Sequence, residues 1–150
     1  MAENRDELVG HYRGSRAELL AAVEGLDEAR LTERTLDGWS VKEHLSHLVL
    51  WDELRASEVE RISAGFDSAW RMTGAHVDAY NDLGHELRRD HSLAQVMWEL
   101  EHSRRRLLDA IERAPERGLD GSLYGEAGLV SDHEQEHAGW IRAWRQRMGY

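Results

Sequence analysis

The sequence contains no cysteine among its 150 residues. Disulfide bonds and thiolate nucleophiles are therefore excluded, and any transition-metal site has to be built from histidine and carboxylate side chains. Proline occurs once, at Pro115, so little in the chain interrupts helices. No apolar run approaches the ~18 residues that a membrane-spanning helix requires, and we expect no membrane partner.

Basic side chains are also scarce. The 19 Lys and Arg residues are outnumbered by 29 Asp and Glu residues, which gives a formal net charge of −10. Because a phosphate-binding surface needs basic residues, this balance argues against a nucleic-acid partner. The one basic run, Arg104 to Arg106, lies among acidic residues and is expected to be a solvated helix face. Charged residues replace the apolar segment of a secretory signal near the start, so we expect a cytoplasmic location.

Length and composition indicate a single domain over residues 1–150. Apolar residues make up 41% and charged residues 32%, proportions typical of a globular chain with its own core. Apolar positions recur at helical spacing in four stretches, and no stretch alternates like a strand. The four helices are expected from Arg5 to Gly25, from the N-cap Ser40 to Gly65, from Val77 to Ala114 in two pieces, and from the N-cap Ser131 to Met148. This pattern predicts an all-α fold, an antiparallel four-helix bundle.

Two histidines lie on the apolar face of the last expected helix. His133 and His137 are four residues apart, so their side chains share one face of a helix. A buried imidazole needs a hydrogen-bond partner, and a metal ion shared by both is an economical explanation. The alternative is a pair of core histidines with ordinary hydrogen bonds. Trp140 and Trp144, on the same helix, are expected in the core.

A third ligand is available on the second expected helix, which carries both His44 and His47. Helical angle places His44 nearer the centre of the apolar stripe and His47 at its edge, next to Trp51. Periodicity alone therefore slightly favours His44 as the inward residue. The remaining histidines lack such a context and are expected at the surface: His11, His76, His85, His91 and His102.

These motifs resemble a known family. The segment 38–48 together with Trp51 resembles the helix motif of the DinB-like (YfiT-like) superfamily, in which a tryptophan and a helix cap precede a histidine–leucine pair. The segment 133–144 is similar to the second metal-binding segment of that superfamily. Tyr80-Asn81, the segment 92–96 and Leu107-Leu108 resemble the ClbS/DfsB branch.

The resemblance implies a bundle, often dimeric, with a three-histidine metal site in a pocket between helices. It selects His47 rather than His44 as the ligand beside His133 and His137. The superfamily includes thiol-dependent transferases and isomerases. Its ClbS-like branch includes proteins that protect their hosts from DNA-reactive natural products, one by hydrolysing an electrophilic cyclopropane.

The sequence thus predicts a divalent-metal-dependent enzyme, a hydrolase or a thiol S-transferase, acting on a small electrophilic molecule. The metal is Zn, Ni or Fe, since imidazole suits all three, and a low-molecular-weight thiol cosubstrate would come from outside the cysteine-free chain. Trp51 and Asn81 are expected in the substrate pocket; their alternative roles are a core residue and a helix-end cap. We expect a homodimer. The competing hypotheses are a non-catalytic, ligand-sequestering bundle and a purely structural histidine site.

Overall fold

The computed structural model describes residues 2–150 and is all-α, which confirms the predicted fold class. Over those residues no β-strand forms, apart from two isolated bridges that join Ala2 to Asp120 and Arg34 to Ser40. No helix within this described range has both the length and the apolar character needed to cross a membrane. The α-helices are α1 (Arg5–Val23), α2 (Glu28–Thr32), α3 (Val41–Ser63), α4 (Gly74–Arg88), α5 (Leu93–Arg113) and α6 (His133–Met148). Two 3-10 turns, Glu116–Leu119 and Gly121–Leu123, lie between α5 and α6.

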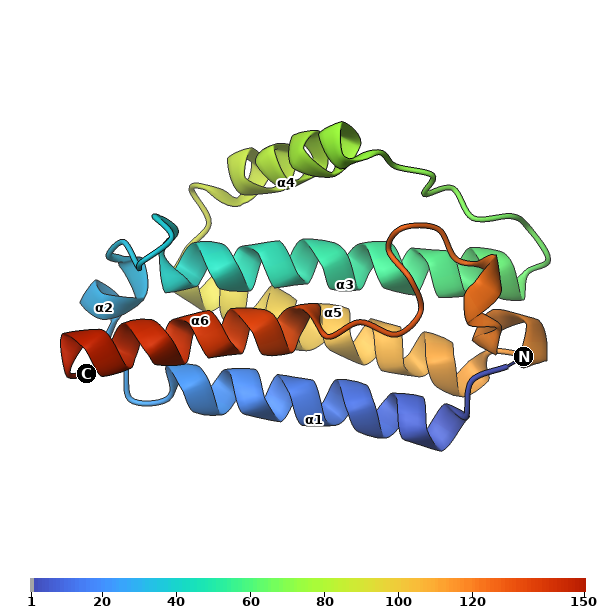
Figure 1. Cartoon of the computed structure of the whole chain (residues 1–150), viewed down its shortest axis with the longest axis horizontal. Helices are drawn as coiled ribbons and strands as arrows, with labels where there is room; N and C mark the ends of the chain where they lie inside the picture. The colour runs from blue at the N-terminus through green and yellow to red at the C-terminus, as the bar shows by residue number, and fades with distance from the viewer. Residues whose placement is uncertain (1) are drawn as a thin grey trace.

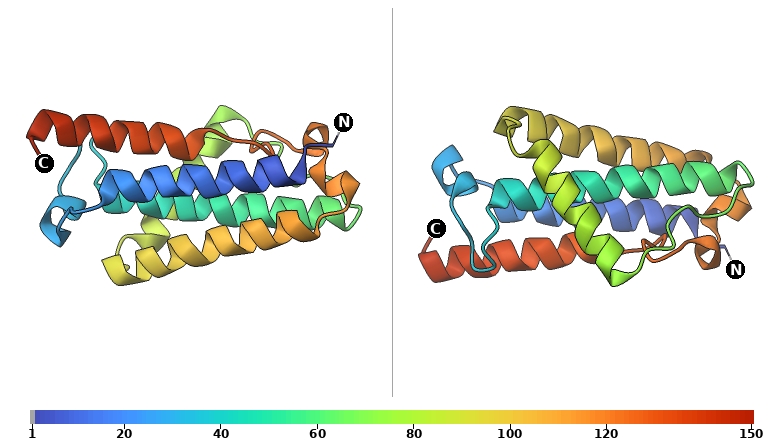
Figure 2. Two further views of the ribbon diagram at one scale, coloured as in Figure 1. Left: turned by 90° about the horizontal axis from the view of Figure 1, so that it is seen from below. Right: turned by 90° about the horizontal axis from the view of Figure 1, so that it is seen from above.

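Four long helices, α1, α3, α5 and α6, form the bundle (Figure 1). The chain runs in one direction along α3 and α5 and in the opposite direction along α1 and α6 (Figure 1). Because α3 and α5 are parallel neighbours, a short loop cannot join them, and the chain returns by a long crossover. The middle of that crossover is α4, which lies outside the bundle and crosses α3 obliquely (Figure 2).

Local signals explain where the two site-bearing helices begin. Ser40 and Glu43 form a full capping box at the start of α3: Glu43 N donates to Ser40 Oγ at 3.1 Å, and Ser40 N donates to Glu43 Oε2 at 2.7 Å. The start of α6 is one residue later than predicted, with Asp132 rather than Ser131 as N-cap. Ser131 Oγ accepts instead from His133 N at 3.2 Å, so it still supports the first turn.

The short helix α2 was not expected, because the sequence predicted a loop between the helix ending at Gly25 and the helix beginning at Ser40. Asp27 caps it by accepting from Arg30 N at 2.9 Å, and α2 buries none of its own residues. A helix this short, without a buried face, leaves no apolar periodicity to detect.

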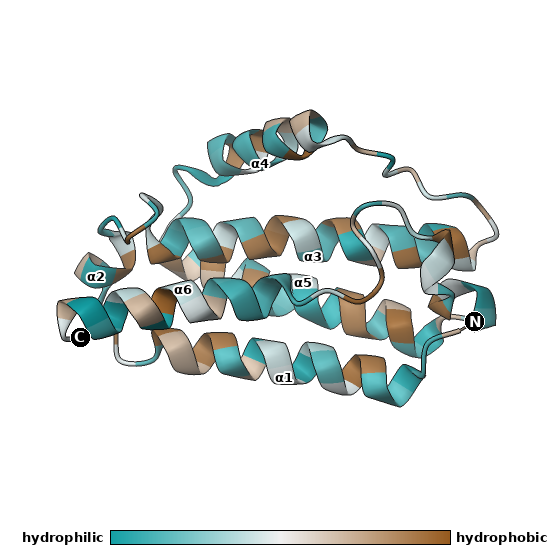
Figure 3. Ribbon diagram, in the orientation of Figure 1, coloured by the Kyte–Doolittle hydropathy of each residue, from teal (hydrophilic) through white to brown (hydrophobic). Residues whose placement is uncertain are grey.

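Hydrophobic and hydrophilic residues alternate along each long helix (Figure 3), and the buried apolar side chains of these helices make up the core. The apolar spacing of the sequence predicts which faces of α1 and α3 are buried, and every residue predicted on those faces is buried or partly buried: Leu8, Tyr12, Ser15, Leu19, Val23 and Leu26, and Val41, Leu45, Leu48, Trp51, Arg55, Val59 and Ile62. The helices enclose two large clusters of apolar side chains, one at each end of the bundle. A smaller cluster, centred on Trp51 and Leu54, packs against residues of α4 and the loop before it.

Between the two large clusters lies a group of four charged side chains, which we call the buried ion cluster: Arg16, Asp52, Arg104 and Glu134. Each is between 2% and 8% exposed. Arg104 donates to both oxygens of Asp52 at 2.9 and 3.0 Å, and its Nη2 lies 2.6 Å from Glu134 Oε2. Arg16 donates to Asp52 Oδ2 at 2.8 Å and to Glu134 Oε1 at 2.6 Å. Two positive and two negative charges therefore balance inside the core.

The buried ion cluster corrects the prediction that Arg104 belongs to a solvated basic face. Arg105 and Arg106 are exposed as expected, but Arg104 is only 5% exposed. Position 104 follows Leu100 by four residues and precedes Leu107 by three, which places it on the buried face of α5. Helical periodicity therefore predicts that Arg104 is buried, whereas the charges of its neighbours wrongly predicted that it is exposed.

Candidate metal centre

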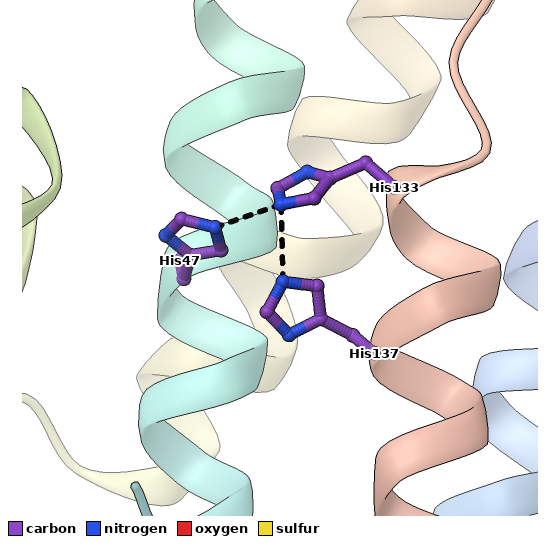
Figure 4. A group of neighbouring side chains, drawn as sticks. All are labelled: His47, His133 and His137. Carbon is purple, nitrogen blue, oxygen red and sulfur yellow. Dashed lines mark hydrogen bonds between the residues drawn. The ribbon is translucent and has the colours of Figure 1, made fainter. Parts of the chain in front are cut away.

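Helices α3 and α6 bring three imidazoles together: His47 from α3, and His133 and His137 from α6 (Figure 4). His133 Nε2 lies 3.0 Å from His47 Nε2 and 3.0 Å from His137 Nε2. One nitrogen from each ring lies within 4.8 Å of the other two. We call these three residues the histidine cluster. The sequence predicted this set as metal ligands, and the structure places all three side by side.

Burial keeps the histidine cluster neutral. His47 is 5% and His137 is 3% exposed, and His133 is partly buried. Burial, followed by the neighbouring imidazoles, lowers the pKa of His47 to about 3. Burial and the nearby Arg55 lower the pKa of His133 to about 4. The pKa of His137 is also well below its usual range, first through burial and then through the other histidines. Neutral imidazoles offer the lone pairs that a metal ion requires.

The donor set fits a divalent metal ion better than it fits mutual hydrogen bonding. A neutral imidazole carries one N–H and one lone pair, so His133 Nε2 cannot donate separate hydrogen bonds to both neighbours. Metal–nitrogen bonds of about 2.0–2.1 Å in a tetrahedral site imply nitrogen separations of roughly 3.3 Å. The observed 3.0 Å separations are close to that value.

His44 is buried as well as His47. The helical angle predicted an inward-facing His44, and the family resemblance predicted His47 as the ligand. His44 is 0% exposed, as its helical angle suggested. It does not belong to the histidine cluster, because its Nδ1 lies 2.7 Å from His137 Nδ1, on the far side of that ring. The geometry therefore favours His47 over His44 as a candidate ligand.

Comparison with known proteins agrees with this fold. The family model of the DinB superfamily matches residues 11–141. The chain belongs to the DinB superfamily. The crystal structure of an uncharacterised protein from Escherichia coli UTI89 is similar, with a TM-score of 0.79 and 14% sequence identity, over 97% of this chain and 94% of that one. At that identity the likeness shows the shared fold alone. No curated protein matches this DinB-superfamily chain.

Trp39, at the end of the loop before α3, covers the histidines. Its ring centroid lies 5.1 Å from that of His47, 5.4 Å from that of His44 and 4.2 Å from that of His85. The prediction that His85 lies at the surface is wrong, since it is partly buried in α4 and stacks 6.0 Å from the His47 ring. The residue was missed because a contact between the crossover and α3 leaves no periodic signal in α4.

The remaining aromatic and histidine predictions are mixed. Trp144 is buried as expected, but Trp140 is 50% exposed, with its ring centroid 4.7 Å from that of His137. His11 and His91 are partly buried, whereas His76 and His102 are exposed as predicted.

Trp51 and Asn81 meet at the side of the histidine cluster that faces α4. Trp51 Nε1 donates to Asn81 Oδ1 at 2.9 Å. The Trp51 ring centroid lies 5.8 Å from that of His133 and 6.2 Å from that of His47. Asn81 is in the interior of α4, so its alternative role as a helix-end cap is not what the DinB-superfamily chain shows. The hydrogen bond instead links the crossover to the wall of the site.

Proposed function

We propose that this protein is a metal-dependent enzyme that acts on a small electrophilic molecule, as a hydrolase or a thiol S-transferase. The observation that carries the proposal is the histidine cluster: three neutral nitrogen donors converge, and the group of candidate ligands among residues 2–150 contains no fourth side chain. Three protein ligands with a vacant coordination position are typical of catalytic sites, whereas structural zinc sites have four.

The residues around the proposed site have separate roles. His47, His133 and His137 would hold the metal ion. A divalent ion bound there would act as a Lewis acid and lower the pKa of a bound water or thiol. Trp39 packs against the His47 ring, and Trp51 with Asn81 would form the wall toward α4. Because the chain has no cysteine, a reacting thiol would come from a cosubstrate.

We further propose, from the sequence resemblance to the ClbS/DfsB branch, that the electrophile is a toxic natural product and that the reaction protects the host. The competing hypothesis is a bundle that sequesters its ligand without turnover. That hypothesis rests on the aromatic side chains beside the histidine cluster, which would supply apolar contacts to a ligand. The Tyr80 ring centroid lies 5.7 Å from that of Trp51 and 4.9 Å from that of Trp70.

Elemental analysis of the purified protein tests the metal site. Wild-type protein is expected to contain about one equivalent of Zn, Ni or Fe, and His47→Ala and His137→Ala are expected to lose it while remaining helical by circular dichroism. His102→Ala is the matched control, because His102 is exposed on α5, a helix that supplies no residue to the histidine cluster. Equal metal content in all four proteins would refute the site.

Turnover separates enzyme from binding protein. The metal-loaded protein is assayed with an epoxide alone and with 1-chloro-2,4-dinitrobenzene plus glutathione, probes of hydrolysis and of thiol transfer. Multiple turnovers that disappear in His137→Ala support the enzyme. Stoichiometric binding without product, unchanged after chelation, supports sequestration instead.

Asn81→Ala tests the pocket wall. Truncation removes the acceptor of the Trp51 N–H, so we expect the protein to remain folded and metal-loaded but to bind or convert its probe less well. Loss of the folded state in Asn81→Ala would show that this hydrogen bond is structural and that the pocket assignment is wrong.

A further inference from the structure

Two further polar side chains, His44 and Asp37, lie next to His137 on the side away from the histidine cluster. His137 Nδ1, the nitrogen directed away from the cluster, lies 2.7 Å from His44 Nδ1. The other nitrogen of His44, Nε2, lies 3.2 Å from Asp37 Oδ2. His44 is 0% exposed, so water cannot substitute for either partner.

The proton positions on these side chains follow from the chemistry of imidazole. For His137 to offer a lone pair at Nε2, toward the cluster, its proton has to be on Nδ1. That N–H donates to His44 Nδ1, which then carries a lone pair. The proton of His44 is consequently on Nε2, facing the Asp37 carboxylate. The opposite arrangement would direct a lone pair of His44 at a negative oxygen and would give His137 the wrong tautomer for binding at Nε2.

Asp37 is held in place by its own turn. Its Oδ1 accepts from Thr35 Oγ1 at 2.8 Å and from Trp39 N at 3.0 Å, which leaves Oδ2 to face His44. The approach of His44 Nε2 to Oδ2 lacks the alignment of a full hydrogen bond, and Nε2 has no other partner. Because the Asp37 side chain is 41% exposed, a small rotation of the carboxylate can complete the bond.

We propose that Asp37 and His44 are positioning residues that set the tautomer and orientation of His137 as a metal ligand. This inference rests on the proposed metal site. A hydrogen-bond partner on the second nitrogen of a ligating histidine orients the ring and raises its basicity. His47 Nδ1 has no such partner, so His137 has a support that His47 lacks. The turn 35–39 thereby becomes part of the site, although none of its residues belongs to the histidine cluster.

Asp37→Asn is the sharpest test, because the amide oxygen can keep both turn hydrogen bonds while the amide nitrogen replaces Oδ2 opposite His44. Two donors then face each other, and His44 has to move its proton to Nδ1. Asp67→Asn is the matched control: it removes the same charge from a loop carboxylate that is 86% exposed, and its ion-pair partner, Arg117, lies in the turn Glu116–Leu119, outside the two helices that carry the histidine cluster. The full-length protein is stripped of metal and titrated with Zn²⁺ against a competing chelator.

Asp37→Asn is expected to weaken Zn²⁺ binding about 10- to 100-fold, the usual effect of losing such a partner, and Asp67→Asn to change it less than about twofold. His44→Ala should weaken binding similarly, without abolishing it. Long-range nitrogen–proton NMR spectra of the histidines supply a readout that stability does not affect: His44 should carry its proton on Nε2 in the wild type and on Nδ1 in Asp37→Asn.

Each result decides the inference. Equal Zn²⁺ affinity in Asp37→Asn and Asp67→Asn, or a wild-type His44 protonated at Nδ1, overturns the positioning role and leaves the metal site standing. A wild-type protein that binds no Zn²⁺, Ni²⁺ or Fe²⁺ overturns the metal site and the positioning role together.

Discussion

Asp52→Asn should destabilise the bundle strongly, because it removes one negative charge from the buried ion cluster without changing the size of the side chain. Asp52 accepts from Arg104 at 2.9 and 3.0 Å and from Arg16 at 2.8 Å, and it is 2% exposed. In the variant, Glu134 alone neutralises two buried guanidinium groups. Removal of one partner from such a pair costs about 3–5 kcal/mol, a large part of the roughly 5–15 kcal/mol by which domains are stable.

Urea unfolding of the metal-free protein, followed by circular dichroism, measures this loss. The slope of the unfolding free energy against urea concentration should remain that of the wild type, while the urea concentration at the midpoint of unfolding falls. Glu60→Gln is the control, because Glu60 pairs with Arg106 at 2.9 Å on the surface, where both side chains are more than 40% exposed. That pair should contribute only about 0–1 kcal/mol. If the two variants lose the same small amount of stability, the buried charges are not what holds this part of the core together.

Three further predictions follow from other parts of the molecule. Acid should destabilise the metal-free protein. Below pH 6.5 the unfolded chain binds protons on His47 and His133, whereas burial lowers the pKa values of these residues in the folded protein to about 3 and about 4. The free energy of unfolding is therefore unaffected above pH 6.5 and decreases as the pH falls toward 4. The loss is about 1.4 kcal/mol per pH unit for each histidine, and urea midpoints at pH 7.5 and pH 5 measure it; identical midpoints would contradict the burial argument. Gly84→Ala places a methyl group 2.4 Å from Leu50 Cδ2, so either the Leu50 side chain or the crossover has to shift. A shift of the crossover costs about 1–3 kcal/mol and should make proteolysis within α4 faster, whereas unchanged proteolysis would mean that Leu50 accommodates the methyl group. The homodimer proposal requires a mass by light scattering of about twice 17.3 kDa, and a monomer at micromolar concentration would reject it.

The long helices could be predicted from the sequence because their signals are local. Ser40 and Glu43 mark the start of α3, and the apolar stripe runs along one face of it. The three histidines could be proposed as metal ligands from the sequence. His133 and His137 are one helical turn apart, and family resemblance added His47. Whether His47 belongs with them depends on how α3 packs against α6, which spacing within one helix does not specify.

What could not be predicted depends on contacts between elements far apart in the sequence. Arg16, Asp52, Arg104 and Glu134 come from four different helices, and each alone resembles a surface charge. His44 presented the opposite difficulty. Helical periodicity predicted that His44 is buried. It could not predict that His44 lies between Asp37 and His137, because these residues are 7 and 93 positions away in the sequence.

The crossover α4 has a consequence for how such a site can diversify. Its route is imposed by topology, since parallel α3 and α5 have to be joined around the outside of the bundle. Only Gly84 and Arg88 of α4 are buried, yet the helix supplies Asn81 and His85 to the side of the site. Substitutions at Asn81 and His85 can therefore change the α4 side of the site while the four-helix core that positions the histidines keeps its packing.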